Sequence, residues 1–328
     1  MKKHLVTGGS GFIGAGLVQR LVADGHDVRV LDNGSRGALR RLASIDGQYD
    51  YHEGDIRDPE TVRRAVAGMD VVWHLAYVNG TEFFYSKPDL VLEVGVKGMI
   101  NVIDACRAEN VGELILASSS EVYQTPPETP TSEDVPLIVP DPQNPRYSYG
   151  GGKIISELLT LNNAQYFDRV QVFRPHNVYG PDMGWEHVLP QFALRVRTLA
   201  AEHPDGPLPF PIQGDGSETR AFCYIDDLVN GLMHMASSGE HRGIYHIGTQ
   251  EEVAIRDIAV HVGACFDCEL SIEPGPLLKG STLRRCPDIS KLASLGYQPK
   301  ISLRDGIARL CAWYDQNAEM APKSKDAK

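Results

Sequence analysis

Two polar segments of the chain hold residue types that could remove a proton from an alcohol. Tyr149 and Lys153 are four residues apart, which places them on one face of a helix. A buried phenol beside an ammonium group has its phenolate form favoured, so we expect the pKa of Tyr149 to fall towards neutrality. Ser119, in the run Ser118–Tyr123, adds a hydroxyl that could hydrogen-bond the same alcohol oxygen. Together the three side chains predict oxidation of an alcohol with transfer of a hydride.

Glu121 lies two residues after Ser119 and indicates a second chemical step. A carboxylate close to the oxidised carbon could remove a further proton. The alternative is a glutamate that only hydrogen-bonds a neighbouring loop, and the residues themselves leave both open.

A glycine-rich turn near the amino terminus has the pattern of a dinucleotide-binding loop. Thr7–Gly14 follows an apolar run and opens a helical pattern, so its glycines permit a tight turn and close approach of a pyrophosphate. The helix start then offers unpaired amides to the phosphates. Asp32 ends the second apolar run, where a carboxylate binds a ribose 2′-hydroxyl and repels a 2′-phosphate. We therefore expect NAD rather than NADP. Arg36 is the argument for NADP, because an arginine just past this strand can pair with a 2′-phosphate.

The residues expected to hold the cofactor come from the ends of several strands: Gly8, Gly11, Phe12, Ile13, Gly14, Asp32, Asn33, Asp55, Ile56, Leu75, Ala76, Tyr149 and Lys153. For Asp55, a carboxylate beside the adenine and a cap for the helix that begins at Pro59 are both open.

The elements that must position these residues alternate regularly through the first half of the chain, which indicates an α/β protein with a Rossmann-type, doubly wound parallel sheet. The expected strands are His4–Thr7, Val28–Asp32, Tyr51–Glu53, Asp70–Ala76, Glu113–Ser118 and Val170–Arg174. The expected helices between them are Gly14–Asp24, Pro59–Ala67, Val91–Glu109 and Gly150–Phe167. The proline-rich stretch Gln124–Arg146 is expected to be a long loop.

After residue 174 the alternation fades, and we expect a smaller C-terminal α/β lobe that binds the substrate. The predicted domains are 1–174 and 175–328, with some segments of the second returning to the first. Its expected elements are helices Glu186–Ala201, Asp226–Ser237, Ile255–Val262 and Ser302–Gln316, and a strand Ile244–Ile247. Asp226 and Asp227 are expected to cap the helix that they open.

Composition narrows the partners of the chain. The 328 residues carry 43 acidic and 32 basic side chains, a formal net charge of -11, which argues against binding to nucleic acid or to an anionic membrane. No segment has the pattern of a signal peptide or the length of a membrane span, so we expect a cytoplasmic protein. Six scattered cysteines, with one CxxC at Cys265 and Cys268, lack the partners of a zinc site, and no metal is expected.

With these residues in hand, the chain resembles the extended short-chain dehydrogenase/reductase family, specifically its NAD-dependent nucleotide-sugar epimerases and dehydratases. The resemblance covers nearly the whole length and rests on the glycine-rich turn together with His74–Ala76, Tyr149–Lys153, Arg174–Pro181, Arg220–Asp227 and Arg284–Lys291. It implies that Tyr149 deprotonates the sugar 4′-hydroxyl, that Lys153 holds the nicotinamide ribose, and that Ser119 hydrogen-bonds the sugar oxygen. The substrate-binding residues that it implies are Ser119, Ser120, Asn177, Arg220 and Arg284, with Arg285 as an alternative to Arg284.

The resemblance implies C4 oxidation and leaves the later steps open. A glutamate at the position of Glu121 accompanies dehydratases and decarboxylases, so a 4,6-dehydratase is favoured by a narrow margin over a C4 epimerase. Ser120 stands where the dTDP-glucose-type dehydratases have an acidic Asp, so dehydration would need another proton donor. A nucleotide-uronate decarboxylase and a non-catalytic sensor of NAD or sugar nucleotide are the further alternatives.

Three places depart from the family pattern. Gly95 stands where Asn is common, Gly151-Gly152 replace Ala-Ser before Lys153, and Pro175-His176 replace aromatic residues before Asn177. The aromatic loop Tyr77–Pro88 follows the fourth strand and either shapes a hexose pocket or packs as a lid on the second lobe. The family further implies a homodimer through the helices Val91–Glu109 and Gly150–Phe167, whose apolar residues cover more than one face.

Overall fold

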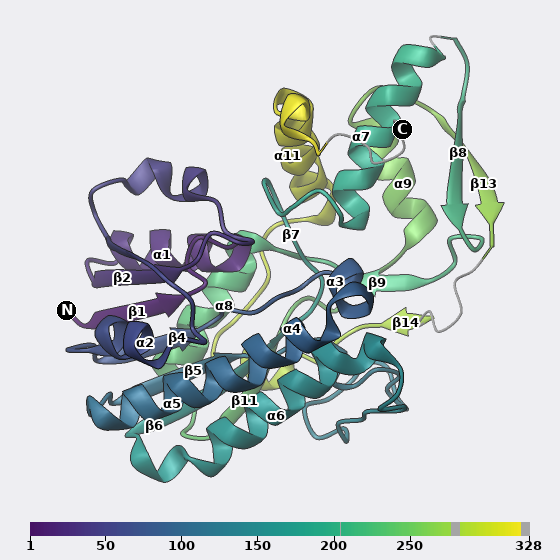
Figure 1. The fold of residues 1–328 in the computed structure, drawn as a ribbon. Helices are drawn as coiled ribbons and strands as arrows, with labels where there is room; N and C mark the ends of the chain where they lie inside the picture. The colour runs from purple at the N-terminus through teal and green to yellow at the C-terminus, as the bar shows by residue number, and fades with distance from the viewer. Residues whose placement is uncertain (204, 277–282, 323–328) are drawn as a thin grey trace.

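A seven-stranded parallel sheet forms the centre of the protein in the computed structural model, which describes residues 1–203, 205–276 and 283–322 (Figure 1). Its strands run in the order β11-β6-β5-β4-β1-β2-β3. They are β1 (Lys3–Thr7), β2 (Asp27–Asp32), β3 (Asp50–Glu53), β4 (Val71–His74), β5 (Glu113–Ala117), β6 (Arg169–Pro175) and β11 (Gly243–Ile247). This is the doubly wound Rossmann order with one strand added at the β6 edge, so the predicted fold class is confirmed.

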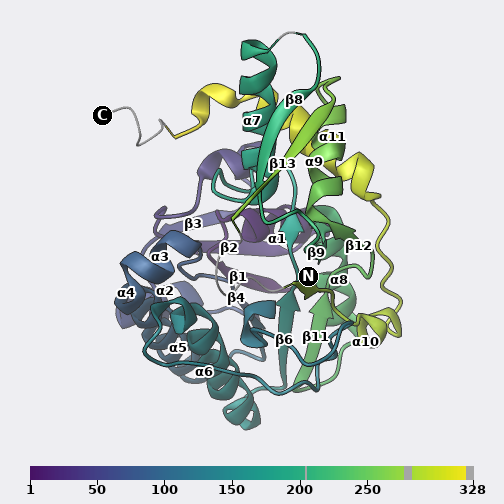
Figure 2. The same ribbon diagram turned by 90° about the vertical axis from the view of Figure 1, so that its right-hand side faces the viewer.

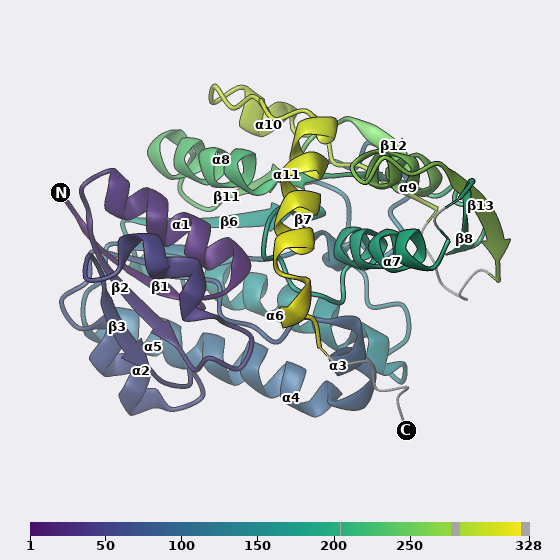
Figure 3. The same ribbon diagram turned by 90° about the horizontal axis from the view of Figure 1, so that it is seen from above.

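Helices cover both faces of the sheet (Figure 3). One face carries α1 (Phe12–Ala23), α8 (Ile225–Ser238) and α10 (Ser290–Ala293), and the other carries α2 (Pro59–Val66), α4 (Pro88–Leu92), α5 (Gly98–Ala108) and α6 (Ser148–Asn162). Neighbouring strand residues point to opposite faces, so Val6 and Trp73 join the core under α1, while Leu5 and Val72 join the core under α5. Because both faces are buried, central strands such as β4 and β5 are mostly apolar, whereas the edge strand β3 is polar.

The expected helix Val91–Glu109 is three consecutive pieces. Between α4 and α5 lies a π-helical segment, η2 (Glu93–Lys97), which contains Gly95. Such segments interrupt helices at functional sites. The preceding loop, expected to be irregular, contains one short helix, α3 (Thr81–Ser86).

The second lobe packs around its own apolar core (Figure 2). Three helices, α7 (Val188–Glu202), α9 (Ile255–Ala264) and α11 (Leu303–Gln316), enclose it beside the parallel pair β8 (Leu208–Gln213) and β13 (Leu270–Gly275). In contrast β11 and α8, from the second half of the chain, belong to the layers of the central sheet. The boundary at residue 174 stays a prediction.

Short strands join the two lobes. β7 (Val178–Tyr179) pairs with β10 (Cys223–Tyr224), and β9 (Thr219–Ala221) lies between β12 (Glu252–Ala254) and β14 (Arg284–Arg285). The short 3-10 segments are η1 (Leu39–Ile45), η3 (Ser120–Val122), η4 (Pro145–Tyr147), η5 (Ala164–Tyr166) and η6 (Ala318–Met320).

The predicted capping role of Asp226 and Asp227 is wrong. α8 begins after Tyr224 without a side-chain cap. Asp227 instead accepts hydrogen bonds from the backbone amides of Lys300 and Ile301, both at 2.9 Å, so it ties the segment before α11 to α8.

Candidate active site

One cavity of ≈ 190 Å³ lies at the carboxyl edge of the sheet, where ligands bind in doubly wound folds. Most of the predicted cofactor residues line it: Gly8, Gly11, Asp32, Asn33, Asp55, Ile56, Leu75 and Ala76. They come from the ends of β1, β2, β3 and β4, because the carboxyl ends of parallel strands meet at one edge. Phe12, Ile13 and Gly14 lie in the first turn of α1, next to the cavity but outside its lining.

The glycine-rich turn fits a pyrophosphate. Gly8 has φ +72°, and a Cβ atom there would lie 2.8 Å from the backbone of Ala76. A Cβ atom on Gly14 would lie 2.2 Å from the carbonyl oxygen of Gly8, so this crossing of turn and helix requires glycine. α1 starts after Gly11 with no side-chain cap, which leaves its first amides to face an anion.

Asp32 and Arg36 show how the adenosine end of the cavity is arranged. The buried carboxylate of Asp32 accepts hydrogen bonds from the amides of Ser10 at 3.0 Å and Gly34 at 2.9 Å. Arg36 also lines the cavity, but its guanidinium group forms an ion pair with Glu186 at 2.7 Å and lies over the ring of Phe83 at 5.1 Å. The cation that could have bound a 2′-phosphate is therefore held by the second lobe, and the residues present fit NAD.

Asp55 lies at the cavity and does not cap a helix. Its carboxylate is paired with Arg57 at 2.8 Å and accepts from Asn33 at 3.2 Å. The hydrogen bond from Arg57 lowers the pKa of Asp55. The cap of α2 is Asp58, which accepts from the amide of Glu60, so the capping alternative for Asp55 is wrong.

The predicted catalytic side chains meet at the end of β5 and the start of α6. Tyr149 and Lys153 share one face of α6, and both are buried. Ser119 is the N-cap of η3, where its hydroxyl accepts from the amide of Glu121 at 3.1 Å, and it hydrogen-bonds Tyr149. Lys153 Nζ donates to the carbonyl oxygen of Ala117 at 2.7 Å. The sheet edge and one helix therefore assemble the trio that the sequence predicts.

The expected lowering of the Tyr149 pKa is wrong for this structure. Burial raises the pKa of Tyr149 to about 12; the hydrogen bond from Ser119 opposes the rise, and the charge of Glu121 adds to it. Burial also lowers the pKa of Lys153 to about 7, while Glu157 opposes that shift. The reason is geometric, because the ammonium group bonds the Ala117 carbonyl instead of lying beside the phenolic oxygen.

Glu121 is held by arginines on the sugar side of the site. Its carboxylate forms an ion pair with Arg285 Nη1 at 2.5 Å. Burial alone would raise the pKa of Glu121, but the charges of Arg285, Arg146 and Arg220 outweigh it, so the pKa lies below its ordinary value. Glu121 is therefore an ionised carboxylate in the field of three guanidinium groups.

Strand register explains why Arg285 and not Arg284 enters the site. In the parallel pair β9–β14, Arg285 is opposite Arg220 and Arg284 is opposite Thr219. Side chains alternate along a strand, so the first pair faces Glu121 and the second faces outward. Arg284 there binds Glu252 at 2.7 Å. Of the two alternatives left by the sequence, the structure favours Arg285.

The other predicted substrate residues lie near this cluster with partners of their own. Arg220 donates to the carbonyl oxygen of Thr219 at 2.7 Å, and burial lowers its pKa to about 10. Asn177 has φ 38° and its amide donates to the carbonyl oxygen of Ala221 at 3.2 Å. Ser120 is buried at the start of η3. Their contacts with a substrate stay predictions.

A buried polar network supports the site from behind. Arg174 pairs with Glu157 at 2.6 Å, Glu157 accepts from Ser118, and Tyr123 links Arg174 to His246 at 2.7 Å. Ser118 therefore belongs to this network through its hydrogen bond to Glu157. The charges within the network are mutually satisfied, as burial requires.

His176 replaces a family aromatic and is also buried. Neither ring nitrogen has a hydrogen-bond partner among the described residues. Burial, with the charges of Arg285 and Arg174 and the neighbouring His246, keeps its pKa well below the usual range, so it is an uncharged ring beside the arginine cluster.

Sequence reasoning missed three side chains of the site. Arg146 faces Glu121 from η4, at the end of the long proline-rich loop. Tyr77 and Phe84 enclose the ring of Tyr149, at centroid distances of 5.2 and 4.9 Å. The aromatic content of the loop Tyr77–Pro88 indicated that this region lies near the site. It did not indicate which two rings would contact Tyr149.

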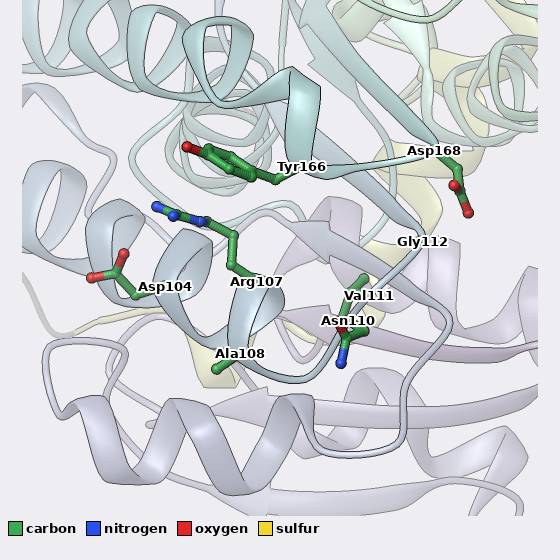
Figure 4. Close-up of a pocket in the computed structure, with 8 residues that line it drawn as sticks. All are labelled: Asp104, Arg107, Ala108, Asn110, Val111, Gly112, Tyr166 and Asp168. Carbon is green, nitrogen blue, oxygen red and sulfur yellow. The ribbon is translucent and has the colours of Figure 1, made fainter.

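A second cavity, of ≈ 660 Å³, lies at the opposite edge of the sheet, where β5 and β6 begin (Figure 4). Its lining includes Asp104, Asn110 and Asp168, and the guanidinium of Arg107 lies 3.9 Å from the ring centroid of Tyr166. No predicted site residue reaches it. The amino edge of a parallel sheet is also not where doubly wound proteins bind ligands, so we assign the cavity no role.

The described residues bear on two further kinds of partner, metal ions and membranes. No group of three or more His, Cys, Asp or Glu side chains is placed to hold a metal ion in that part of the chain. Within the same residues, none of the helices has the length and apolar character needed to span a bilayer. The cytoplasmic location stays a prediction.

Comparison with known proteins identifies the family of the chain. Residues 4–248 match the model of the "NAD dependent epimerase/dehydratase family". The chain is 30% identical to UDP-glucose 4-epimerase of Mycolicibacterium smegmatis, over 97% of this chain and 100% of that protein. It is 32% identical to UDP-glucuronic acid decarboxylase 2 of Arabidopsis thaliana, over 92% of this chain and 66% of the relative.

Among solved structures, the protein is similar to DesIV, the dTDP-glucose 4,6-dehydratase of Streptomyces venezuelae, crystallised with NAD and TYD. The TM-score is 0.84 and the identity 29%, covering 97% of this chain and 98% of DesIV. The cavity fits NAD, and the match extends over both lobes. This chain therefore belongs to the NAD-dependent epimerase/dehydratase family of nucleotide-sugar enzymes.

Proposed function

We propose that this enzyme oxidises a nucleotide-uronate at C4 and then decarboxylates it. One observation carries the proposal: the carboxylate of Glu121 lies in the field of three guanidinium groups, Arg146, Arg220 and Arg285. Two further carboxylates, Glu218 and Glu252, act on Arg220 and offset part of its charge. A diphosphate would use part of this positive charge. The remainder favours a sugar that brings a carboxylate of its own, for which the planar guanidinium of Arg285 is a suitable partner.

The first step is an oxidation assigned to the buried trio. Tyr149 takes the proton of the 4′-hydroxyl, Ser119 holds the same oxygen, and Lys153 holds the nicotinamide ribose. NAD, when bound, supplies the acceptor for the C4 hydride and brings a positive charge near Tyr149. That charge acts against the burial that raises the Tyr149 pKa.

The second step follows from the position of the new ketone. In a 4-keto uronate the C6 carboxylate is β to the C4 carbonyl, so the C5–C6 bond can break and release carbon dioxide. The electron pair of that bond passes to C5 and is delocalised onto the C4 oxygen, near the hydroxyl of Ser119. A proton from water then adds at C5. The hydride removed in the first step can return to C4 while Tyr149 gives its proton back to the C4 oxygen, which restores both the base and the oxidised cofactor. No acid at the C6 oxygen is needed.

Dehydration between C5 and C6 is the second candidate, and the sequence alone put it first. The ionised state of Glu121 favours it, since an ionised carboxylate can take the C5 proton. Loss of the C6 hydroxyl also needs a proton donor. Glu121, with its pKa below the usual value, is poorly suited to that role, and Ser120 is no acid. Decarboxylation therefore fits the charges better.

Product analysis tests the proposal. The enzyme is incubated with NAD and a panel of nucleotide sugars that includes the glucuronates of uridine, thymidine, guanosine and cytidine diphosphates, and products are measured by mass spectrometry. Loss of carbon dioxide from a uronate is the expected result. Loss of water, a changed stereochemistry at unchanged mass, or NAD binding without conversion would instead indicate a dehydratase, an epimerase or a sensor.

We also propose that the enzyme is a homodimer through α5 and α6. Ile100 on α5 and Ile155 and Leu158 on α6 are exposed by 42%, 39% and 57%, although all three are apolar. Covering them with a second copy would remove this surface from water. Sedimentation at micromolar concentration should give a dimer; a monomer would contradict the assignment.

A further inference from the structure

Tyr77 is a half-buried residue to which no role in the site has been assigned. It follows β4 by three residues and lines the cofactor cavity. Its hydroxyl is buried and has no hydrogen-bond partner among the described residues. A phenol in such a place loses hydration without a compensating bond, so its position needs another explanation.

The ring of Tyr77 contacts both members of the catalytic pair. Lys153 Nζ lies 3.9 Å from the ring centroid, over the face of the ring. The ring also meets Tyr149 edge to face, at 5.2 Å and 85°. Phe84 stacks on Tyr149 at 4.9 Å and 18°. The base is therefore held between two aromatic rings, and its lysine is held on one of them.

Two glycines make the space for this phenol. A Cβ atom on Gly95 would lie 2.1 Å from the Tyr77 hydroxyl and 2.4 and 2.5 Å from its ring carbons. A Cβ atom on Gly152 would also lie 2.1 Å from the hydroxyl, but 3.5 Å from the nearest ring carbon. Gly95 belongs to the π-helical segment η2 and Gly152 to α6, so two elements leave one notch. Both glycines are departures from the family pattern.

We propose that Tyr77 is a positioning residue for the catalytic pair: its hydroxyl sits in the notch formed by Gly95 and Gly152, and its ring face holds the Lys153 ammonium group beside Tyr149. The inference rests on the proposed roles of Tyr149 and Lys153 but not on the identity of the sugar. It accounts for both glycines with a single side chain.

The ring of Tyr77 attracts the Lys153 ammonium group through its face, because the phenol itself carries no charge. Burial and the neighbouring Tyr149 raise the pKa of Tyr77 far above its usual value, so it stays a neutral phenol. Lys153 donates one hydrogen bond, to Ala117, and an aromatic face attracts a cation that has few other partners.

The other titratable groups that face Lys153 come from β4 and α6. His74 on β4 is uncharged at neutral pH, because burial lowers its pKa to about 3. On α6, Glu157 attracts the ammonium group, but its carboxylate is already paired with Arg174. Tyr149, also on α6, is neutral until it loses its proton. The ring of Tyr77 is thus a main local support for the charge.

Thermal unfolding of paired variants tests the notch. Gly152→Ala should lower Tm by about 5 °C, because the new methyl group meets the phenolic oxygen. In the Tyr77→Phe background the same change should cost nothing, since the remaining ring carbon is at ordinary contact distance. Gly95→Ala is the matched control: the ring itself blocks it, so Tyr77→Phe should not rescue it. Equal losses from Gly152→Ala in both backgrounds would overturn the proposal.

The pH dependence of NAD binding tests the support of Lys153 without any sugar. Calorimetry should show affinity falling as pH rises through the pKa of Lys153, and Lys153→Met should remove that dependence. Tyr77→Leu should move the midpoint down by about one pH unit, while Tyr77→Phe keeps it. An unmoved midpoint in Tyr77→Leu, or a dependence that survives Lys153→Met, overturns the proposal. Neither result depends on which nucleotide sugar is converted.

Discussion

The cofactor half and the sugar half of the active site are built in different ways. In the cofactor half, Gly8, Asp32 and Ala76 each lie at or just after the end of a strand of one sheet, so their place follows from the local order of the chain. In the sugar half, Arg220 and Arg285 are neighbours only because β9 pairs with β14. The sheet edge thus places the residues that fit the cofactor, whereas pairings between distant segments place the arginines to which we assign the choice of sugar.

The largest expected effect comes from Tyr149, which both halves share. Tyr149→Phe removes the proton acceptor, so turnover should fall by about 10²–10⁴-fold while NAD still binds. Steady-state kinetics and calorimetry measure the two quantities. Tyr147→Phe is the control, since Tyr147 lies outside α6 and at the wrong helical spacing from Lys153. A Tyr149→Phe enzyme with wild-type turnover would exclude the phenol as the base.

Substitution of the two neighbouring arginines of β14 distinguishes the sugar half of the site from the cofactor half. Arg285→Ala leaves Glu121 without its ion pair, so kcat/KM for the sugar should fall by about 10–100-fold with little change in NAD affinity. Arg284→Ala also removes a guanidinium group, but this group binds Glu252 outside the site. The variant should therefore keep kcat/KM within about two-fold of the wild type. Equal losses from both variants would refute the strand-register argument.

Gly14 tests the cofactor half alone. Gly14→Ala places a methyl group 2.2 Å from the backbone of Gly8, which cannot yield as a side chain can, so stability should fall by about 1–3 kcal/mol and NAD affinity with it. Gly16→Ala on the same helix meets side-chain atoms of Val229 at 3.1 Å and should be milder. Chemical denaturation and NAD titration of both variants give the comparison, and equal effects would contradict it.

Lys153 lies between the two halves of the site, and its effect appears as a pH dependence of stability. Its pKa is about 7 when folded, against about 10.4 when unfolded, so between these values only the unfolded chain holds the proton. The stability of the wild type should therefore rise with pH relative to Lys153→Met, by up to about 1.4 kcal/mol per pH unit, and level off below pH 7. Denaturation of both proteins across this range measures the difference. Parallel curves would mean that Lys153 is not desolvated.

The same contrast explains what the sequence could predict. Most strands of the sheet were predictable because they are short apolar runs, as in Val71–His74 and Glu113–Ala117, separated by amphipathic helical patterns. β8 was missed, since Leu208–Gln213 contains two prolines and pairs with a strand that begins at Leu270. The three short strands around Arg220 were missed for a related reason, because no local pattern marks strands of two or three residues.

Within the site, residue types were predictable and their electrostatics were not. Ser119, Tyr149 and Lys153 meet as expected, but the pKa of Tyr149 rises because Lys153 bonds the Ala117 carbonyl. That bond depends on how α6 crosses β5, which helical spacing does not reveal. The contact of Tyr77 with the catalytic pair could not be predicted for a similar reason, because the position of its ring depends on two glycines from different helices.

The central claim is that the sugar half selects a uronate. The most direct measurement is the ratio of kcat/KM for a nucleotide-glucuronate to that for the glucose derivative of the same nucleotide, in the wild type and in Arg285→Ala. The wild-type ratio should be about 10² or more in favour of the uronate, and it should fall towards unity in the variant. A wild type that prefers the neutral sugar, or a preference for the uronate that Arg285→Ala leaves unchanged, would contradict it.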